Sequence, residues 1–271
     1  MTASSSSSSS DSSQSFLNSL PEIVPGETFF FSCHPQVPCF NACCAELTLP
    51  LTPYDVLRLT RNLGMSSDQF FEEYVEAGAA EDTGFPVVRL LMEDIPGKPC
   101  PFVTEKGCGV YPDRPSACRT YPLGRACRPD GAGGLLEQYF LVREEHCRGF
   151  EQNAAFTTAT WLTDQGLVAY HAANDRYMLL LARYKEKAGE AKLSSRFATM
   201  ALLCLYQQDR FADLIRSMKL LERVQPLTDA ARERLPRVLE DPEARLDFAL
   251  DWLELVVLGQ SAALAPVAPQ S

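Results

Sequence analysis

The ten cysteines constrain this chain more than any other feature of its sequence. Four of them lie within twelve residues, in the segment FSCHPQVPCFNACC at positions 31–44. Five more follow between positions 100 and 147, and only Cys204 lies outside these two groups. Thiolates at short and long spacings bind a soft metal ion when the chain folds back to complete a shell of about four sulfurs. The distribution therefore predicts a metal or iron–sulfur site in the first half of the chain.

A disulfide framework is the alternative interpretation of these cysteines, and it would suit a secreted chain. The N-terminal sequence MTASSSSSSSDSSQS has neither the basic start nor the apolar core of a signal peptide. The chain has 271 residues, 46% of them hydrophobic, and is much longer than a disulfide-stapled mini-protein. We therefore expect a cytoplasmic protein whose clustered thiols bind metal.

The charge and hydropathy of the chain indicate whether it binds nucleic acid, a membrane or another protein. The formal net charge is −10 and the isoelectric point is about 4.9. An acidic surface repels phosphate backbones, so we expect no nucleic-acid partner. No run of eighteen apolar residues occurs, so we expect no membrane span. The acidic second half could bind a protein partner or be only a solvated helical surface, and the sequence leaves both open.

The pattern along the chain indicates a mainly α fold with a small β component, in which a cysteine-rich metal-binding module is followed by a helical bundle. The almost pure serine start cannot bury apolar surface, and the end is small and rich in proline. We expect four segments: a disordered tail and linker at 1–28, the module at 29–153, a helical region packed on it at 154–260, and a disordered tail at 261–271.

Local signals place several elements within this outline. Thr52, Pro53 and Asp55 are typical of a helix start, and Gly64 of its end. Ser66 starts a second helix, whose apolar positions extend to Val75. Strands are expected at 86–92 and 136–142, a proline- and glycine-rich loop at 96–125, and further helices at 156–187 with a break near Gly166, 192–207, 209–223 and 241–258.

The spacing of the thiols excludes some kinds of metal site and leaves others open. Thiolates are poor ligands for Ca²⁺ and Mg²⁺, so zinc and iron–sulfur clusters are the candidates. Neither paired zinc knuckles nor a ferredoxin-type cysteine run is present. A radical-SAM spacing begins at Cys39 and Cys43, but its third position is Glu46. The three phenylalanines at 29–31 are expected to form an apolar wall beside the site.

Four separated motifs carry a resemblance to a known family: FSCHPQVPCFNACC, LTPYDVLRL, GKPCPFVTEKGCGVYPDRPSACRTYP and EHCRGF. Occurring in this order over roughly residues 29–190, they resemble the YkgJ-type cysteine-cluster family, which is described as zinc- or iron-chelating. Here five residues separate Cys33 from Cys39 instead of the commoner two, which leaves open whether both bind one ion. The resemblance implies that a zinc ion or an iron–sulfur cluster is bound by Cys33, Cys39, Cys43, Cys44, Cys100, Cys108, Cys118 and Cys147.

Other polar residues near these motifs have two interpretations each. Arg114 and Arg119 would offset the negative charge of a thiolate-bound cofactor, or Arg119 would only cap carbonyls. His34 and His146 flank proposed ligands. Either could replace a thiolate as a ligand, but we expect them to make hydrogen bonds or to lie at the surface. Cys127 lies beside a glycine-rich turn outside the motifs, and Cys204 lies in an apolar helical stripe where a core role is expected.

Two classes of function follow from the predicted site. The first is a metal-binding protein without catalytic activity, with a redox-related role left open. The second is an iron–sulfur-dependent protein-modifying enzyme, because flagellin lysine methylases carry a similar cysteine cluster. We expect the sulfurs of the segment 33–44 to lie together with those of Cys100, Cys108, Cys118 and Cys147. The sequence does not decide whether the protein is an enzyme.

Overall fold

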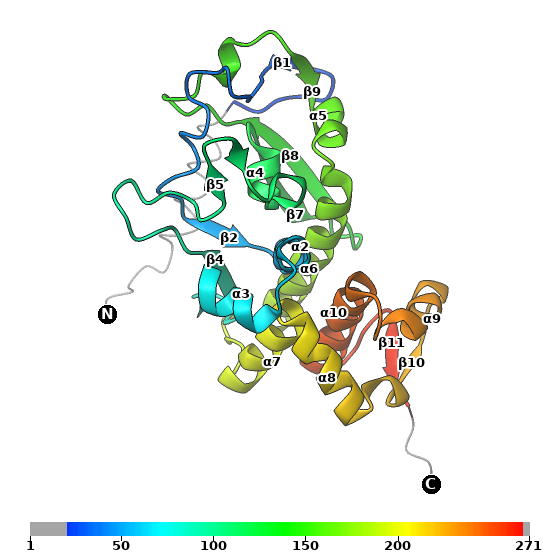
Figure 1. Ribbon diagram of the computed structural model, residues 1–271. Helices are drawn as coiled ribbons and strands as arrows, with labels where there is room; N and C mark the ends of the chain where they lie inside the picture. Colours follow the sequence, from blue (N-terminus) through cyan, green and yellow to red (C-terminus); the bar gives the residue numbers. More distant parts are fainter. Residues whose placement is uncertain (1–20, 268–271) are drawn as a thin grey trace, which may run out of the picture. The chain divides into compact units, whose positions relative to one another are not determined.

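The computed structural model describes residues 21–267 and divides the chain into two compact units (Figure 1). The first unit comprises the residues up to Cys43 together with Ala117–Val168. The second comprises Cys44–Ser116 together with the residues from Ala169 onward. Both units are discontinuous in sequence, and each receives part of the cysteine-rich half. The division does not coincide with the boundary expected at 153 and 154, and the expected disorder of residues 1–15 lies outside the described residues.

Two antiparallel strand pairs organise the first unit. Strand β1 (Thr28–Phe30) pairs with β9 (Ala155–Thr157), so that Phe29 lies opposite Phe156. Strands β7 (Leu123–Pro129) and β8 (Leu135–Leu141) form a hairpin, labelled in Figure 1. β8 confirms the strand predicted at 136–142. Ile23 is buried and Glu22 bridges to Phe140, so the segment expected to be a linker up to residue 28 is ordered from Pro21.

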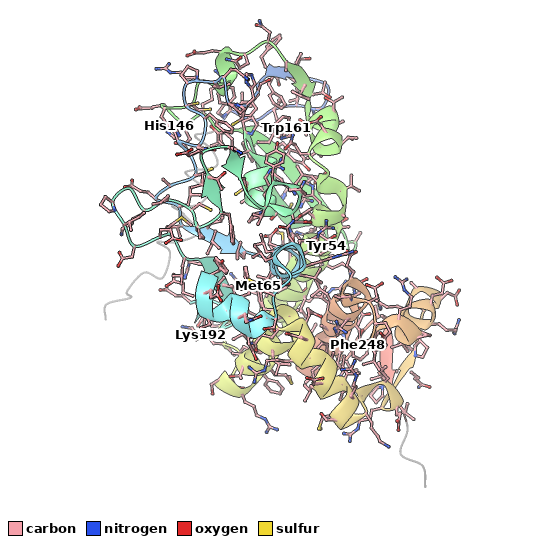
Figure 2. The ribbon with its side chains drawn as sticks, viewed as in Figure 1. Tyr54, Met65, His146, Trp161, Lys192 and Phe248 are labelled. Atoms are coloured by element: carbon pink, nitrogen blue, oxygen red, sulfur yellow. The ribbon has the colours of Figure 1, made fainter. Side chains whose placement is uncertain are left out.

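An aromatic core fills the first unit. Helix α5 (Thr158–Asp164) presents Trp161, labelled in Figure 2, whose ring makes an edge-on contact with Phe31 at 5.6 Å between centroids. The indole N–H of Trp161 donates to the carbonyl of Thr120 at 3.1 Å. Phe29 and Phe31 are buried, but the side chain of Phe30 is 53% exposed because alternate strand residues point to opposite faces. The expected wall is therefore made by two of the three rings.

The second unit contains a three-stranded antiparallel sheet in the order β2 (Leu49–Leu51), β4 (Pro86–Leu90) and β3 (Val75–Ala79). β4 confirms the strand predicted at 86–92. The prediction that Val75 is helical is wrong, because helix α3 (Ser67–Tyr74) ends one residue earlier and Val75 is extended. A β-branched residue suits this position, where Val75 pairs with Leu90.

Helix α2 (Pro53–Leu63) begins and ends where the sequence predicts. The Thr52 side chain accepts a hydrogen bond from the backbone N–H of Asp55, and the Asp55 carboxylate accepts one from the backbone N–H of Thr52. This reciprocal capping satisfies two donors at the helix start. Gly64 ends the helix in the left-handed conformation that glycine adopts without steric cost.

Five further helices among the described residues are α6 (Leu167–Ala188), α7 (Ser195–Tyr206), α8 (Gln208–Met218), α9 (Asp229–Arg234) and α10 (Pro242–Leu258). The break predicted near Gly166 is confirmed, since α5 ends at Asp164 and α6 begins at Leu167. The helix predicted at 209–223 ends early, because Lys219 has a φ of 50°. The described residues are thus mainly helical with small sheets, and none of their helices is long and apolar enough to cross a membrane.

Two segments expected to lack structure contain short elements. The loop predicted at 96–125 holds β5 (Val103–Thr104), β6 (Gly107–Cys108), a 3₁₀ turn and α4 (Ser116–Thr120). The end of the chain, expected to fray from residue 261, forms β11 (Leu264–Pro266), which pairs with β10 (Val224–Pro226). These corrections share a cause: strands of two or three residues have no periodicity that a sequence could reveal.

Candidate metal centre

The segment before Cys33 lies along the segment after Cys147 in the first unit. The backbone N–H of Phe31 donates to the carbonyl of Ala154 at 2.9 Å, and that of Ser32 to the carbonyl of Gly149 at 3.0 Å. These bonds continue the pairing of β1 with β9 toward the two cysteines. The first motif and the last motif therefore lie side by side, although more than a hundred residues separate them.

Cys39 is joined directly to the last motif. Its Sγ accepts a hydrogen bond from the backbone N–H of Arg148, the residue after Cys147, at 3.0 Å. The backbone N–H of Cys147 itself donates to the carbonyl of Glu144, which closes a turn. A backbone N–H aimed at sulfur stabilises the thiolate form of a cysteine, and such bonds orient thiolate ligands around a metal. The structure thus brings Cys39 next to Arg148, the residue that follows Cys147.

Gly149 is required by the close approach of these two segments. A Cβ at this position would lie 2.5 Å from Cε2 of Phe31 and 2.9 Å from the carbonyl oxygen of Ser32. Both distances are shorter than van der Waals contact, so only glycine fits without displacing the Phe31 ring. The glycine of the Cys-x-Gly motif has a packing role beside the cysteines.

Tyr121 adds a polar group that the sequence interpretation did not single out. Its ring packs edge-on against Phe31, with 5.7 Å between the centroids. Tyr121 is the residue directly after α4, the helix that carries the exposed Cys118. Its hydroxyl is buried and makes no hydrogen bond of normal geometry within the described residues. Burial raises the pKa of Tyr121 well above its ordinary value, interaction with the Cys147 thiol raises it further, and Cys43 contributes at longer range. The signal available in the sequence was the tyrosine of the RTYP segment.

Three other proposed ligands belong to the second unit. The backbone N–H of Cys100 donates to the carbonyl of Cys44 at 2.8 Å. Cys108 lies on β6 and pairs with Val103, three residues after Cys100. Burial raises the pKa of both the Cys100 and the Cys108 thiols, and the nearby Cys108 raises that of Cys100 further. The second unit therefore places the backbone of Cys44 beside that of Cys100, and the Cys108 thiol near the Cys100 thiol.

Arg114 lies beside this second group. Its guanidinium stacks over the ring of Tyr111, with its carbon 3.8 Å from the centroid, and donates to the Tyr111 carbonyl at 2.8 Å. Its positive charge lowers the pKa of Cys108, against the larger effect of burial. A buried guanidinium beside a thiol favours the thiolate form that a metal requires.

Arg119 makes the contact expected of a carbonyl-capping residue. Its Nη1 donates to the carbonyl of Gln165 at 2.6 Å, at the end of α5, and the side chain is buried. The structure thus gives Arg119 a role in holding α5 beside α4 in the first unit. Its proposed contact with a cofactor stays a prediction.

The remaining polar candidates have ordinary surroundings. The Nδ1 of His34 contacts the side-chain oxygen of Gln36 at 2.7 Å, and His146 is exposed (Figure 2). Cys127 lies within β7 opposite Glu137, in the strand that leads into the glycine-rich turn. Cys204 is fully buried on α7, which confirms its core role.

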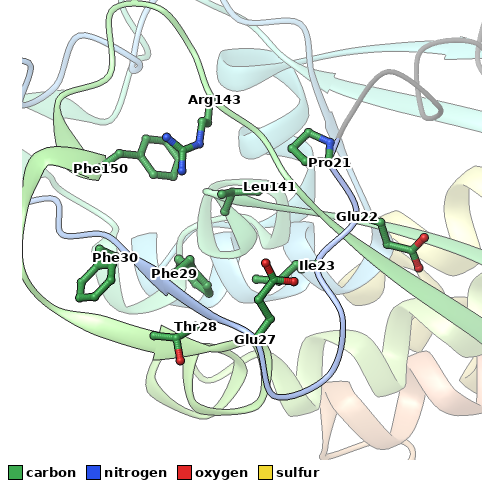
Figure 3. A pocket seen from close by; sticks show the side chains of 10 residues that line it. All are labelled: Pro21, Glu22, Ile23, Glu27, Thr28, Phe29, Phe30, Leu141, Arg143 and Phe150. Carbon is green, nitrogen blue, oxygen red and sulfur yellow. The ribbon is translucent and has the colours of Figure 1, made fainter.

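A shallow pocket in the first unit lies among Phe29, Phe30, Phe150 and Arg143 (Figure 3). The guanidinium carbon of Arg143 is 4.6 Å from the centroid of the Phe150 ring, a cation–π contact that the close-up shows. The residues that line this pocket include no cysteine and no histidine. The pocket is therefore separate from the thiols and is not a candidate for binding a soft metal.

The chemistry of the donors fits a soft metal. All ten cysteines are thiols. Among residues 21–267, however, no three or more His, Cys, Asp or Glu side chains are gathered closely enough to hold a metal ion. The structure brings the Arg148 backbone to the Cys39 thiol and the Cys100 backbone to that of Cys44. Sulfur donors with adjacent N–H and O–H groups fit zinc or an iron–sulfur cluster.

Comparison with known protein families agrees with this donor chemistry. The family described as CxxCxxCC, “Putative zinc- or iron-chelating domain”, matches residues 32–152. The matched range is less than half of the chain, and it contains all eight cysteines proposed as ligands while leaving out Cys204. No curated protein and no solved structure matches the chain. Residues 32–152 are therefore similar to a cysteine domain of the zinc- or iron-chelating type.

Proposed function

We propose that the protein is a metal-binding protein that holds a zinc ion or an iron–sulfur cluster through its cysteine cluster. The observation that carries the proposal is the match of residues 32–152 to a zinc- or iron-chelating domain. The hydrogen bond from the Arg148 N–H to Cys39 Sγ supports it, because it joins the first and last cysteine motifs. The proposal concerns binding; a redox role or an enzymatic activity would each need an observation of its own.

The proposed ligands fall into two groups, one in each unit. The boundary between the units falls between the neighbouring residues Cys43 and Cys44. Five belong to the first unit and three to the second. The first-unit ligands are Cys33, Cys39, Cys43, Cys118 and Cys147, and the second-unit ligands are Cys44, Cys100 and Cys108. Arg114 would balance the charge of the second group, since its guanidinium already acts on Cys108. Within each unit, these thiolates would hold a zinc ion or an iron–sulfur cluster, and that bond would tie together the loops that carry them.

Metal analysis of the full chain tests this function. The protein is purified without oxygen, and its zinc, iron and acid-labile sulfide are measured together with its visible absorption spectrum. A colourless protein with stoichiometric zinc indicates a zinc site, whereas iron, sulfide and absorption in the visible range indicate a cluster. A protein that binds neither after supply of both metals under reducing conditions would disprove the proposal.

Single serine variants connect the bound metal with the named cysteines. Cys43→Ser and Cys118→Ser should lose most of the metal, because a hydroxyl is a poor substitute for a soft thiolate. Cys204→Ser and Cys127→Ser are matched controls outside the proposed ligand set and should keep it. Full metal occupancy in both Cys43→Ser and Cys118→Ser would show that the site lies elsewhere. A triple variant of Cys44, Cys100 and Cys108 would show how much metal depends on the second unit.

A further inference from the structure

We propose that the exposed edge of strand β3, in the second unit, binds an extended and basic segment of a protein partner. The segment adds to the sheet as an antiparallel strand beside β3. Backbone hydrogen bonds, one apolar side chain in an adjacent pocket and basic side chains beside exposed carboxylates together define the interaction. The proposal goes beyond metal binding, because none of its contacts involves a cysteine.

The register of β3 against β4 shows which backbone groups of β3 point away from the sheet. The N–H of Leu91 donates to the carbonyl of Tyr74, and the N–H of Ala80 donates to the carbonyl of Phe85, both at 2.8 Å. Hydrogen-bonded and non-bonded pairs alternate along an antiparallel ladder, so every second residue of β3 directs its N–H and its carbonyl away from β4. These residues are Val75, Ala77 and Ala79.

The two edges of this sheet differ in what they offer to another strand. On β2, Pro50 lies opposite Arg89, whose backbone groups are directed toward β3, so the Pro50 nitrogen faces outward and has no hydrogen to donate. On β3, residues 76–79 are all exposed, and no atom lies within 4 Å of a Cβ built on Gly78. An exposed edge strand without proline or lysine is a template for pairing with another chain. The open edge is therefore that of β3.

A pocket beside β3 fits one apolar side chain of the added strand. Its volume is about 200 Å³, below the roughly 300 Å³ at which sites for drug-sized ligands begin. Val87 lines it together with Phe85, Tyr177 and Leu181. Val87 pairs with Gly78, so the two positions lie on the same face of the sheet, and glycine leaves that face uncovered. A partner residue opposite Gly78 would thus direct its side chain toward the pocket.

Exposed carboxylates around β3 indicate the charge of the partner. Four of them take no part in any ion pair in the part of the chain that the structure describes: Glu72, Glu73, Glu76 and Glu81. Arg89 lies opposite Glu76 in the register, but the described residues include no ion pair between them. Asp82, at the pocket, is already paired with Lys185 at 3.0 Å. Lysine or arginine side chains on the added strand would complement the four carboxylates.

Titration of the full chain with a synthetic peptide tests the proposal. The probe is acetyl-TKVLVKT-amide, whose leucine is placed opposite Gly78, whose valines are opposite Ala77 and Ala79, and whose lysines are beside the carboxylates. Calorimetry should detect binding that weakens as salt is added. N-methylation of both valines removes the two N–H groups directed at β3 and should weaken binding by about tenfold or more. N-methylation of the leucine, whose N–H points away from β3, is the matched control and should leave the affinity unchanged.

Substitutions in β3 provide a second test. Ala77→Pro removes an outward N–H and no hydrogen bond to β4, so the protein should fold and should no longer bind the probe. Ala77→Val keeps that N–H and should bind as the unmodified protein does. If Ala77→Pro does not fold, amide hydrogen exchange of the unmodified chain, measured by NMR, takes its place. The probe should slow the exchange of the Ala77 and Ala79 amides.

Several results would overturn the proposal and leave the metal site untouched. They are a probe that does not bind at about 1 mM, equal losses of affinity from the two N-methylated probes, and exchange at Ala77 and Ala79 that the probe does not change. A dimeric protein that Ala77→Pro converts to a monomer would assign the edge to a second copy of this chain and would also overturn the proposal.

Discussion

Asp55 accepts two hydrogen bonds from Ser116, a residue sixty-one positions further along the chain. One comes from the backbone N–H at 2.7 Å and the other from the hydroxyl at 3.0 Å. The same fully buried carboxylate caps α2 by accepting the N–H of Thr52. Ser116 is the first residue of α4, and Cys118 follows two residues later. The start of α2 therefore fixes the backbone that leads into one of the cysteine motifs.

The first prediction concerns this carboxylate. Asp55→Ala should lower the free energy of unfolding by about 2–4 kcal/mol, because it removes part of a helix cap and leaves partly buried donors of Thr52 and Ser116 without an acceptor. Urea denaturation followed by circular dichroism measures the change. Asp68→Ala removes an exposed carboxylate from the first turn of α3 and should cost less than about 0.5 kcal/mol. Equal effects of the two substitutions would contradict the role assigned to Asp55.

A second prediction follows from the contact between Gly149 and Phe31. Gly149→Ala should lower the free energy of unfolding by about 1–3 kcal/mol, because the added methyl group displaces a buried ring. It should also reduce metal per chain, since Cys147 lies two residues away. Gly78→Ala is the control: no atom lies within 4 Å of the position of its added Cβ, and we expect a change below about 1 kcal/mol. A stable, fully loaded Gly149→Ala protein would refute the packing argument.

Local signals explain which parts of the fold were predictable. The helix starts at Thr52 and Ser66 follow from capping residues a few positions apart, and both caps are present in the structure. The pairing of β1 with β9 depends on residues more than a hundred positions apart, and each strand has only three residues. Neither their length nor their pattern distinguishes such strands from loops.

The candidate site shows the same division. Cysteine spacing identified the thiols, because soft-metal chemistry restricts which residues can serve. The roles of Gly149 and Tyr121 depend on a ring from another segment, Phe31, that reaches both of them. From its sequence position, the Arg119 guanidinium could donate a hydrogen bond either to a cysteine sulfur or to a backbone carbonyl. In the structure it donates to the carbonyl of Gln165. These roles depend on which residues lie close together in the folded chain, and a single sequence does not give that information.

The third prediction concerns the reactivity of the buried thiols in metal-free protein. Burial raises the pKa of Cys100 and Cys108, so their thiolate fraction at pH 7.5 is small. Their alkylation by iodoacetamide should be slow at that pH and should accelerate as the pH approaches the raised pKa values. Mass spectrometry of peptides from the full chain measures each rate. Addition of zinc should then protect both thiols, and a rate independent of pH would contradict the effect of burial.

The last prediction concerns the end of the chain. Leu264 is only 1% exposed and lies on β11, and the carbonyl of the preceding residue, Ala263, accepts the N–H of Leu227 at 2.8 Å. Leu264→Ala should lower the free energy of unfolding by about 2–4 kcal/mol, because it empties a buried position. Val267→Ala, at an exposed apolar residue three positions later, should cost less than about 0.5 kcal/mol. Truncation after Ala263 should destabilise the protein at least as much as Leu264→Ala, because it also removes the strand that pairs with β10. Thermal unfolding of the three variants measures this order, and an unchanged melting temperature after truncation would restore the expectation of a disordered tail at 261–271.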